Sequence, residues 1–313
     1  MAFRLRPQES VADGLRRLAT KEVRSAREDL RRTAPPRDDA IHEARKSVKK
    51  VRAVLELVEV SDGCGLGGSN ERLRRLNRIL SRLRDADAMV GVLADLRARD
   101  PHLLSEHTFA RVHRHLVSRK REAMENAERD GAWTKVDREL RKVRRAAAKR
   151  WRPAKRGFGA VVPGMRLVHR RGRKAMARAR KRQTAADFHE WRKQIKALWY
   201  ALRLVERAGR IIRRDAAALH RAETWLGEAH NVVVLCAELS ENASICGGLA
   251  DLDRVRLIGH QYQCELRANA IAAVGRIYRR KSGPYVRAIK RAWTALRRGH
   301  EAAHHRRRDR TAA

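Results

Sequence analysis

Apolar residues recur at helical spacing along nearly the whole chain, and no convincing run alternates apolar and polar residues as a strand does. Proline is scarce and falls between the periodic runs, where it ends or begins a helix. The pattern therefore predicts an all-α protein. The expected helices cover about residues 10–32, 38–60, 70–99, 103–129, 133–151, 165–182, 186–208, 211–241, 249–281 and 284–300.

Two of these expected helices carry nearly the same sequence. The segment H-E-A-R-K-S-V-K from His42 to Lys49 recurs 147 positions later as H-E-W-R-K-Q-I-K from His189 to Lys196. An internal repeat indicates a fold of two related halves. A Gly- and Pro-containing stretch at 155–164 separates them, so we expect helical bundles at 1–153 and 164–300 and a basic, disordered tail at 301–313.

Both copies of the repeat place a histidine and a row of cations on one side of a helix. At 100° per residue, His42, Arg45, Lys46 and Lys49 share one face, and Val48, Val51, Leu55 and Val58 lie opposite. The second copy has the same arrangement. Because a row of like charges repels itself, this duplicated pattern favours an anionic ligand.

Composition points to the same class of partner. The formal net charge is +38 and the sequence pI is about 11.5, which suits nucleic acid, an anionic membrane or an inorganic polyanion. Arginines number 59 of the 74 basic residues, and the arginine fork grips phosphate oxygens in pairs. The scattered cysteines, the N-terminus without a signal sequence and the lack of any long apolar run predict a cytoplasmic protein that does not enter the membrane.

Two short motifs suggest other chemistry but fail in context. H-E-x-x-H, from His300 to His304, has Arg-rich flanks and too little chain after it for a third zinc ligand. G-x-G-x-x-G, from Gly63 to Gly68, follows an expected helix rather than a strand, so it does not indicate dinucleotide binding. We expect neither a metal site nor a cofactor.

The repeated H-x-x-R-K-x-x-K helices and the basic segment from Arg170 to Arg173 resemble the CHAD domain, the conserved histidine α-helical domain, over about residues 10–293. The third helices match as well, with Leu80 and Asp85 answered by Leu226 and Asn231. The resemblance implies two pseudo-symmetric bundles around a basic central cavity, binding of inorganic polyphosphate and association with polyphosphate granules. Many relatives carry an N-terminal triphosphate-tunnel domain, and we expect none in this chain.

The candidate polyphosphate-binding residues combine the two repeats with basic positions at equivalent places in the halves. They are His42, Arg45, Lys46, Lys49, Lys50, Arg52, Arg84, His113, Arg121, Arg170, Arg171, Arg173, His189, Arg192, Lys193, Lys196, His230, His260 and Arg267.

We expect a cytoplasmic, non-enzymatic protein that binds polyphosphate, with nucleic acid acting only as a non-specific polyanion competitor. One alternative is a basic helical protein whose ligand is nucleic acid, although no known reader motif is present and aromatics are few. A second is an accessory enzyme that processes phosphoanhydrides, although the cation helices lack the carboxylates that hold catalytic metal ions. The sequence leaves the oligomeric state open.

Overall fold

The chain is helical throughout the part that the computed structural model describes, which is residues 3–32, 38–60, 68–150 and 157–312. No strand occurs in these ranges, and this confirms the prediction of an all-α fold. The α-helices are α1 (Val11–Asp29), α2 (Asp38–Glu59), α3 (Ser69–Arg99), α4 (Glu106–Arg129), α5 (Ala132–Arg150), α6 (Val162–Arg182), α7 (Ala185–Arg203), α8 (Arg210–Glu241), α9 (Leu249–Arg279) and α10 (Ser282–Ala312). Short 3₁₀ turns are η1 (Gly157–Ala160), η2 (Glu206–Ala208) and η3 (Ala243–Cys246).

Side-chain caps mark where several helices begin. The hydroxyl oxygens of Ser10, Ser105 and Thr184 accept hydrogen bonds from the first-turn amides of α1, α4 and α7. Such a cap satisfies an amide that the helix itself leaves without a partner. It also fixes the start of α7, the helix that carries the second repeat.

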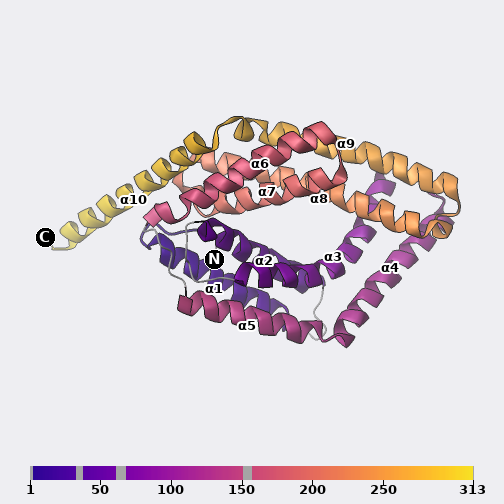
Figure 1. Cartoon of the computed structure of the whole chain (residues 1–313), viewed down its shortest axis with the longest axis horizontal. Helices are drawn as coiled ribbons and strands as arrows, with labels where there is room; N and C mark the ends of the chain where they lie inside the picture. The colour runs from indigo at the N-terminus through magenta and orange to yellow at the C-terminus, as the bar shows by residue number, and fades with distance from the viewer. Residues whose placement is uncertain (1–2, 33–37, 61–67, 151–156, 313) are drawn as a thin grey trace.

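The helices form two groups that face each other. Figure 1 shows α1, α2 and α5 in one group and α6, α7 and α8 in the other, with α10 beside the second group. The largest hydrophobic core joins both groups and includes Val48 and Leu55 from α2 and Ile195 and Leu202 from α7. These are the apolar positions that the repeat predicts, so each repeat helix buries one face and leaves its cationic face outside the core.

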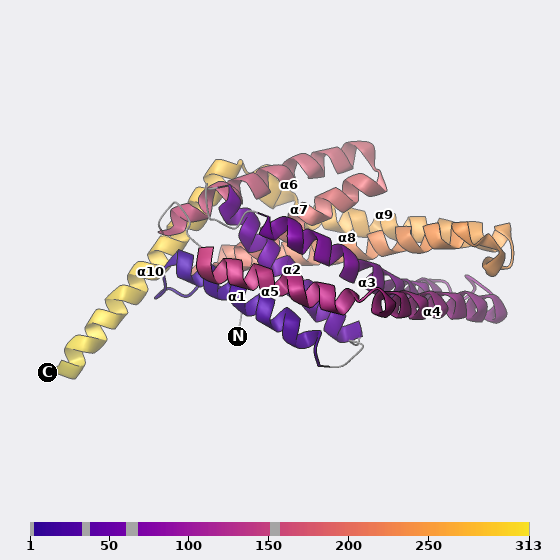
Figure 2. The same cartoon turned by 60° about the horizontal axis from the view of Figure 1, so that its bottom comes forward.

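A second, smaller core holds the far end of the molecule. Leu93 and Leu96 of α3, Leu116 of α4, Leu235 of α8 and Val255 of α9 all belong to it. Figures 1 and 2 both show this end of α3, α4, α8 and α9 extending beyond the remaining helices. The long helices α3 and α8 therefore tie the two groups together at a distance from the repeat helices.

The start of α6 packs directly on the end of α2. A Cβ atom at Gly164 would lie 2.2 Å from the Leu57 carbonyl oxygen, so only glycine allows the two backbones to approach this closely. This contact holds the second group of helices against the first.

The predictions for the segments between helices fall largely outside the described residues, and the prediction for the C-terminal tail differs from the structure. Part of the predicted boundary stretch at 155–164, and most of the G-x-G-x-x-G segment from Gly63 to Gly68, lie outside the described residues. The disordered tail predicted for 301–313 differs from the structure, in which α10 continues to Ala312. Alanine and arginine are strong helix formers, so the composition of this segment is compatible with a continued helix. Figures 1 and 2 show this end of α10 projecting away from the other helices.

Within the described ranges, no helix is long and apolar enough to cross a membrane. Cys236, Cys246 and Cys264 are free thiols, and Cys64 lies outside the described residues.

Candidate functional site

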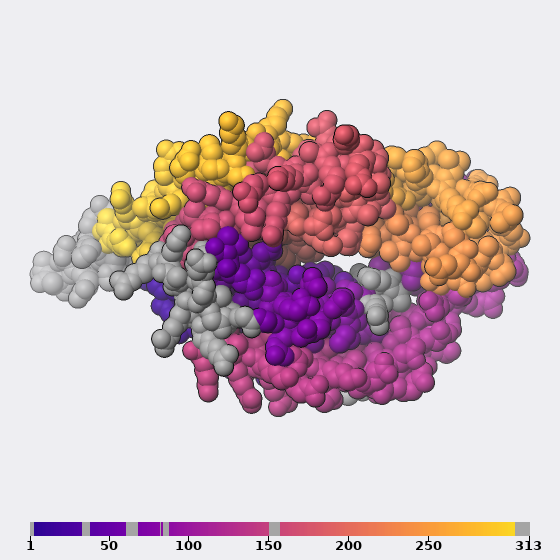
Figure 3. Space-filling view, viewed as in Figure 1, coloured from indigo at the N-terminus to yellow at the C-terminus, as the bar shows by residue number. Residues whose placement is uncertain are grey.

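The cationic faces of α2 and α7 are brought together. We define the cation cluster as Arg45 and Lys49 from α2 with Arg192 and Lys196 from α7. The charges of Lys196, Arg45 and Arg192 all act on Lys49, which shows that the two rows share one region. Figure 3 shows a hollow in the molecular surface between the purple atoms of α2 and α3 and the red to orange atoms of the facing helices.

Lys49 is the most strongly perturbed cation of the cluster. Burial first, and then the positive charges of Lys196, Arg45 and Arg192, lower the pKa of Lys49 to about 6. Its ammonium group makes no ion pair or hydrogen bond with any residue that the structure describes. Lys49 is therefore largely uncharged at neutral pH and would regain its proton beside an added anion.

On the α7 side, a buried carboxylate from α8 balances the cations. Lys196 Nζ donates to Glu223 Oε1 at 2.5 Å, and Arg192 Nη2 lies 3.1 Å from the same oxygen. Burial acts to raise the pKa of Glu223, but Lys196 and Arg192 outweigh it and lower that pKa. Burial also lowers the pKa of Lys196, although Glu223 opposes the shift. Glu223 is thus an ionised internal counterion.

The sequence analysis missed Glu223, although a signal for it exists. Glu223 stands on the stripe of α8 that carries Leu219 and Leu226 into the core, and it is itself only 6% exposed. A single carboxylate within an apolar stripe requires a buried cationic partner. The position in α3 that corresponds to Glu223, at the same offset of 146 as the leucines, is Asn77.

Arg45 lies on the α3 side of the cluster. Its guanidinium donates to the Ser81 hydroxyl at 3.0 Å, and the Asn77 amide donates to the same hydroxyl at 3.4 Å. Ser81 and Asn77 of α3 thus lie next to Arg45, whereas Glu223 of α8 lies next to Arg192 and Lys196.

The repeat histidine of α7 lies against a histidine of α8. The ring centroids of His189 and His230 are 4.2 Å apart. Burial first, and then His230, Lys193 and Arg192, lower the pKa of His189 to about 4. His189 is therefore neutral near pH 7 and can donate a single hydrogen bond. His42, its counterpart at the start of α2, is exposed.

The remaining cations of the repeats have local partners. Lys46 and Lys193 each pair with the glutamate three residues earlier, Glu43 and Glu190. Lys50 points toward α1, where its ammonium lies 2.9 Å from the buried Glu22. Arg52 donates to the Asn70 amide oxygen at 3.2 Å. Lys46 and Lys193 flank the cation cluster, whereas Lys50 is engaged by α1.

Four of the predicted site residues on α4 and α9 are not in contact with the cluster. His113 stacks on Phe109, and Arg121 lies 3.7 Å from Glu125 on an exposed face of α4. His260 is exposed, beside Cys264. Arg267 is buried over the Phe188 ring, and burial lowers its pKa. For Arg84 the structure describes the α3 backbone but not the side chain.

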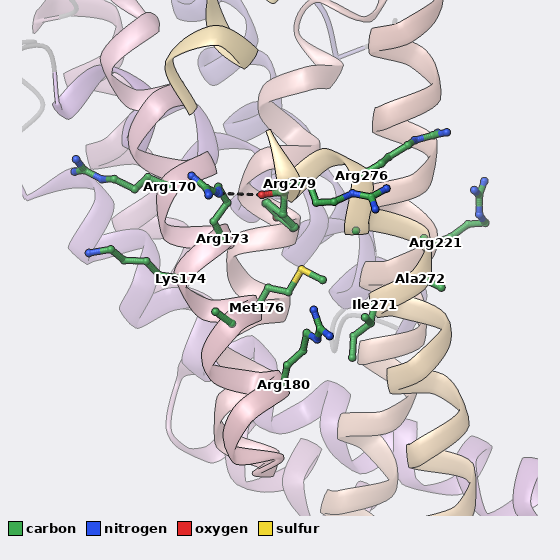
Figure 4. A pocket seen from close by; sticks show the side chains of 14 residues that line it. Arg170, Arg173, Lys174, Met176, Arg180, Arg221, Ile271, Ala272, Arg276 and Arg279 are labelled. Carbon is green, nitrogen blue, oxygen red and sulfur yellow. Dashed lines mark hydrogen bonds between the residues drawn. The ribbon is translucent and has the colours of Figure 1, made fainter. Parts of the chain in front are cut away.

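The three predicted arginines of α6 take two directions. Arg171 pairs with Glu56 of α2 at 3.0 Å. Arg170 and Arg173 instead line a groove between α6 and α9, shown in Figure 4, and Arg173 donates to the Tyr278 carbonyl oxygen at 2.9 Å. Some of the candidate residues therefore lie at the cation cluster between α2 and α7, Arg170 and Arg173 line a separate groove on α6, and the candidates on α4 and α9 lie outside both.

Among the side chains that the structure describes, no group of three or more His, Cys, Asp or Glu is placed to hold a metal ion. His300, the first residue of the H-E-x-x-H motif, is instead 2.7 Å from the Gln8 amide nitrogen.

Comparison with known proteins identifies the family. The CHAD domain model matches residues 15–240, so the chain belongs to the CHAD domain family, a family of binding domains for which polyphosphate binding is a general property. This confirms the resemblance noted from the repeats. No match was found among curated proteins.

Two solved structures share the fold. The crystal structure of the CHAD domain from the plant Ricinus communis is similar with a TM-score of 0.62 and 17% identity, covering 94% of this chain and 95% of that one. PptA from Streptomyces chartreusis is similar with a TM-score of 0.57 and 15% identity, covering 91% of this chain and all of that one, 100%. At such identities the likeness establishes the fold.

Proposed function

We propose that this protein binds inorganic polyphosphate at the cation cluster between α2 and α7. The observation that carries the proposal is Lys49, which burial and three neighbouring cations hold at a pKa of about 6 without an ion-pair partner among the described residues. Protonating a buried lysine among like charges is unfavourable unless an anion joins them. A chain of phosphates supplies that anion and stabilises both rows at once.

The donors suit phosphate oxygens. Arg45 and Arg192 offer planar forks, whereas Lys49 and Lys196 offer point charges that adapt to a flexible chain. Counterions released from the polymer add to the affinity, so log affinity should fall roughly linearly with log salt concentration. His189, neutral at the edge of the cluster, supplies one hydrogen bond.

The cluster favours a phosphate chain over single-stranded nucleic acid, whose binding usually relies on bases stacked on aromatic rings. Trp199 lies one turn beyond Lys196 on α7. His220 stacks on its ring with centroids 4.3 Å apart and planes within 1°, and Arg203 lies 5.4 Å from the ring centroid. Trp199 is the side chain beside the cluster that could best stack on a base, and His220 already covers its ring. Nucleic acid then acts as a non-specific competitor.

We infer that the protein binds without catalysis and associates with polyphosphate granules in the cytoplasm. Glu223, the carboxylate in ion-pair contact with Arg192 and Lys196, is engaged by both cations and would not act as a base. Such a site binds the intact polymer without cleaving it. If instead the protein processes phosphoanhydrides, incubation with polyphosphate and Mg²⁺ would release phosphate or shorten the polymer.

The direct test compares two variants that each replace three basic side chains. Arg45→Gln, Lys49→Gln and Arg192→Gln together remove three basic groups of the cluster, and Arg287→Gln, Arg291→Gln and Arg298→Gln remove three exposed charges from α10, at least as much charge as the cluster variant loses. Binding of labelled long-chain polyphosphate at fixed salt should weaken about 100-fold in the cluster variant, at ~1 kcal/mol per lost contact, and only slightly in the control. Equal losses would mean that diffuse charge does the binding.

Competition separates the ligand classes. Unlabelled polyphosphate and duplex DNA, matched in phosphate concentration, are titrated against the labelled complex at the same salt. Polyphosphate should displace the label at much lower concentration. Preferential displacement by DNA would instead favour a nucleic-acid-binding protein.

A further inference from the structure

A second cationic feature lies apart from the cluster, between α6 and α9. The groove has a volume of about 1260 Å³, above the ~300–1,000 Å³ usual for small-molecule pockets. In Figure 4 residue numbers rise in opposite directions along α6 and α9, so the two helices run antiparallel. Its size suits a segment of polypeptide better than a small molecule.

The rim of the groove is basic. Arg173 is held by the Tyr278 carbonyl oxygen, whereas none of the other basic side chains forms an ion pair or hydrogen bond within the described chain. These are Arg170, Lys174, Arg180, Arg221, Arg276 and Arg279. Elsewhere, surface arginines commonly face a carboxylate, as Arg171 faces Glu56 and Arg178 faces Asp187. No Asp or Glu is among the residues that line the groove. The rim is therefore suited to an acidic partner.

The floor of the groove is apolar and made largely of small residues. It consists of Met176, Ala177, Ile271, Ala272, Ala273, Gly275 and the Tyr278 ring. Figure 4 shows Met176 and Ile271 between the two helices, with Arg170 and Lys174 on the outer side of α6 and Arg221 and Arg276 on the opposite side. Small residues allow another helix to approach closely. A bare phosphate chain has no apolar atoms to cover such a floor.

From these features we propose that the α6/α9 groove docks an acidic amphipathic helix of a partner protein. The apolar face of that helix lies on the alanine-rich floor, and its Asp and Glu residues meet the basic rim on both sides. This is the helix-in-groove mode of recognition, in which an amphipathic helix places its apolar face in a groove. The groove then gives a polyphosphate-binding protein a means of bringing another protein to the polymer, and it acts independently of the cation cluster.

The test uses the full chain and two labelled peptides of about 20 residues, some 30 Å of helix. One peptide is an acidic helix with a Leu/Ala stripe, and the other has the same composition scrambled so that no stripe remains. Fluorescence anisotropy at fixed salt should show the amphipathic peptide binding about tenfold more tightly or better, a difference of ~1.4 kcal/mol. Equal binding of both peptides would overturn the proposal.

Two variants locate the binding. Arg180→Glu with Arg276→Glu reverses charge on the rim. Ala177→Arg with Ala272→Arg adds positive charge at two exposed positions but fills the floor. Both variants should lose about tenfold in amphipathic-peptide affinity, or ~1.4 kcal/mol, while circular dichroism shows unchanged helix content. Unchanged or tighter binding to the arginine-filled variant would mean that charge alone attracts the peptide, which contradicts the proposal.

Polyphosphate affinity separates this site from the cluster. Arg180→Glu with Arg276→Glu should reduce polyphosphate binding far less than the cluster variant does. An equal reduction would make the groove part of the polyphosphate path and overturn the proposal of a protein partner. Loss of polyphosphate binding in the cluster variant, with peptide binding retained, would support both proposals separately.

Discussion

The ammonium group of Lys196 lies 2.5 Å from the Glu223 carboxylate, whereas Lys49, its equivalent in the first repeat, has no carboxylate at ion-pair distance among the described residues. Lys196 and Lys49 therefore differ in their described partners even though the two repeat helices carry the same cations. Glu223 stabilises Arg192 and Lys196 in the unliganded protein. Lys49 depends more on an external anion.

Replacing Glu223 with glutamine should destabilise the unliganded protein. Removing one partner of a buried ion pair leaves uncompensated charge and costs about 3–5 kcal/mol. Polyphosphate should restore much of this loss, so the rise in melting temperature on adding polymer should be larger for Glu223→Gln than for the unchanged protein. Thermal unfolding with and without polyphosphate measures both effects, and an equal rise in both proteins would argue against a bound phosphate near Arg192 and Lys196.

Adding a carboxylate beside Arg45 should weaken binding. Asn77 shares the Ser81 hydroxyl with Arg45, so Asn77→Asp adds a negative charge beside the cluster. A charge of this sign should repel the polymer by about 1 kcal/mol, roughly a fivefold loss of affinity. Asn70→Asp is the matched control, because Asn70 is on the same helix but contacts Arg52 instead. Equal losses in both variants would indicate a general charge effect.

The helices and the buried faces of the repeats follow directly from the sequence. The 3.6-residue period places Val48 and Leu55 on one side of α2 and Arg45 and Lys49 on the other, and the core of the structure obeys that division. Repetition of the pattern also pointed to the family. The apolar period stops before the last turns of α10, and so it did not predict that α10 continues to Ala312.

Which cations meet depends on packing between helices, and periodicity carries no information about it. Lys50 is adjacent in sequence to Lys49, yet it turns to Glu22 of α1. Arg173 belongs to the basic segment expected at the polyphosphate site, yet it lies at the α6/α9 groove with Arg276, which the sequence did not single out. Which cations lie together is set by the crossing angles of the helices and by contacts between helices that are distant in the sequence.

The close contact between α6 and α2 gives a test of the fold. Gly164→Ala would force a methyl group against the Leu57 backbone, and overpacking of this kind costs about 1–3 kcal/mol or more. Gly91, in the middle of α3, is the matched control, since a Cβ atom there would contact nothing within 4 Å. Gly91→Ala should stabilise the protein by about 0.5–1 kcal/mol through helix propensity. Chemical denaturation of both variants measures the difference, and a stable Gly164→Ala protein would contradict the packing.

Binding of polyphosphate should draw protons into the cluster. The groups that act on Lys49 are the cations Lys196, Arg45 and Arg192 and the carboxylate Glu223, and burial with the cations sets its pKa near 6 in the free protein. A bound phosphate adds negative charge and raises that pKa. At pH 7.5 the free protein leaves Lys49 unprotonated, so the complex should take up about one proton at this residue.

The sign of the pH dependence follows from this uptake. Below about pH 6 Lys49 is protonated in both states and contributes no slope. Between pH 6 and the higher pKa of the complex, the bound state holds more protons, so affinity must fall as pH rises. His189 also has a lowered pKa, about 4, and remains neutral in the free protein across this window.

Isothermal titration calorimetry in two buffers of different ionisation enthalpy counts the protons. Lys49→Arg keeps a positive charge that does not titrate in this range, so the uptake assigned to Lys49 should disappear while binding is retained. The slope of affinity against pH should flatten in the same variant. If Lys49→Arg takes up as many protons as the unchanged protein, the uptake arises elsewhere, and Lys49 does not contact the polymer.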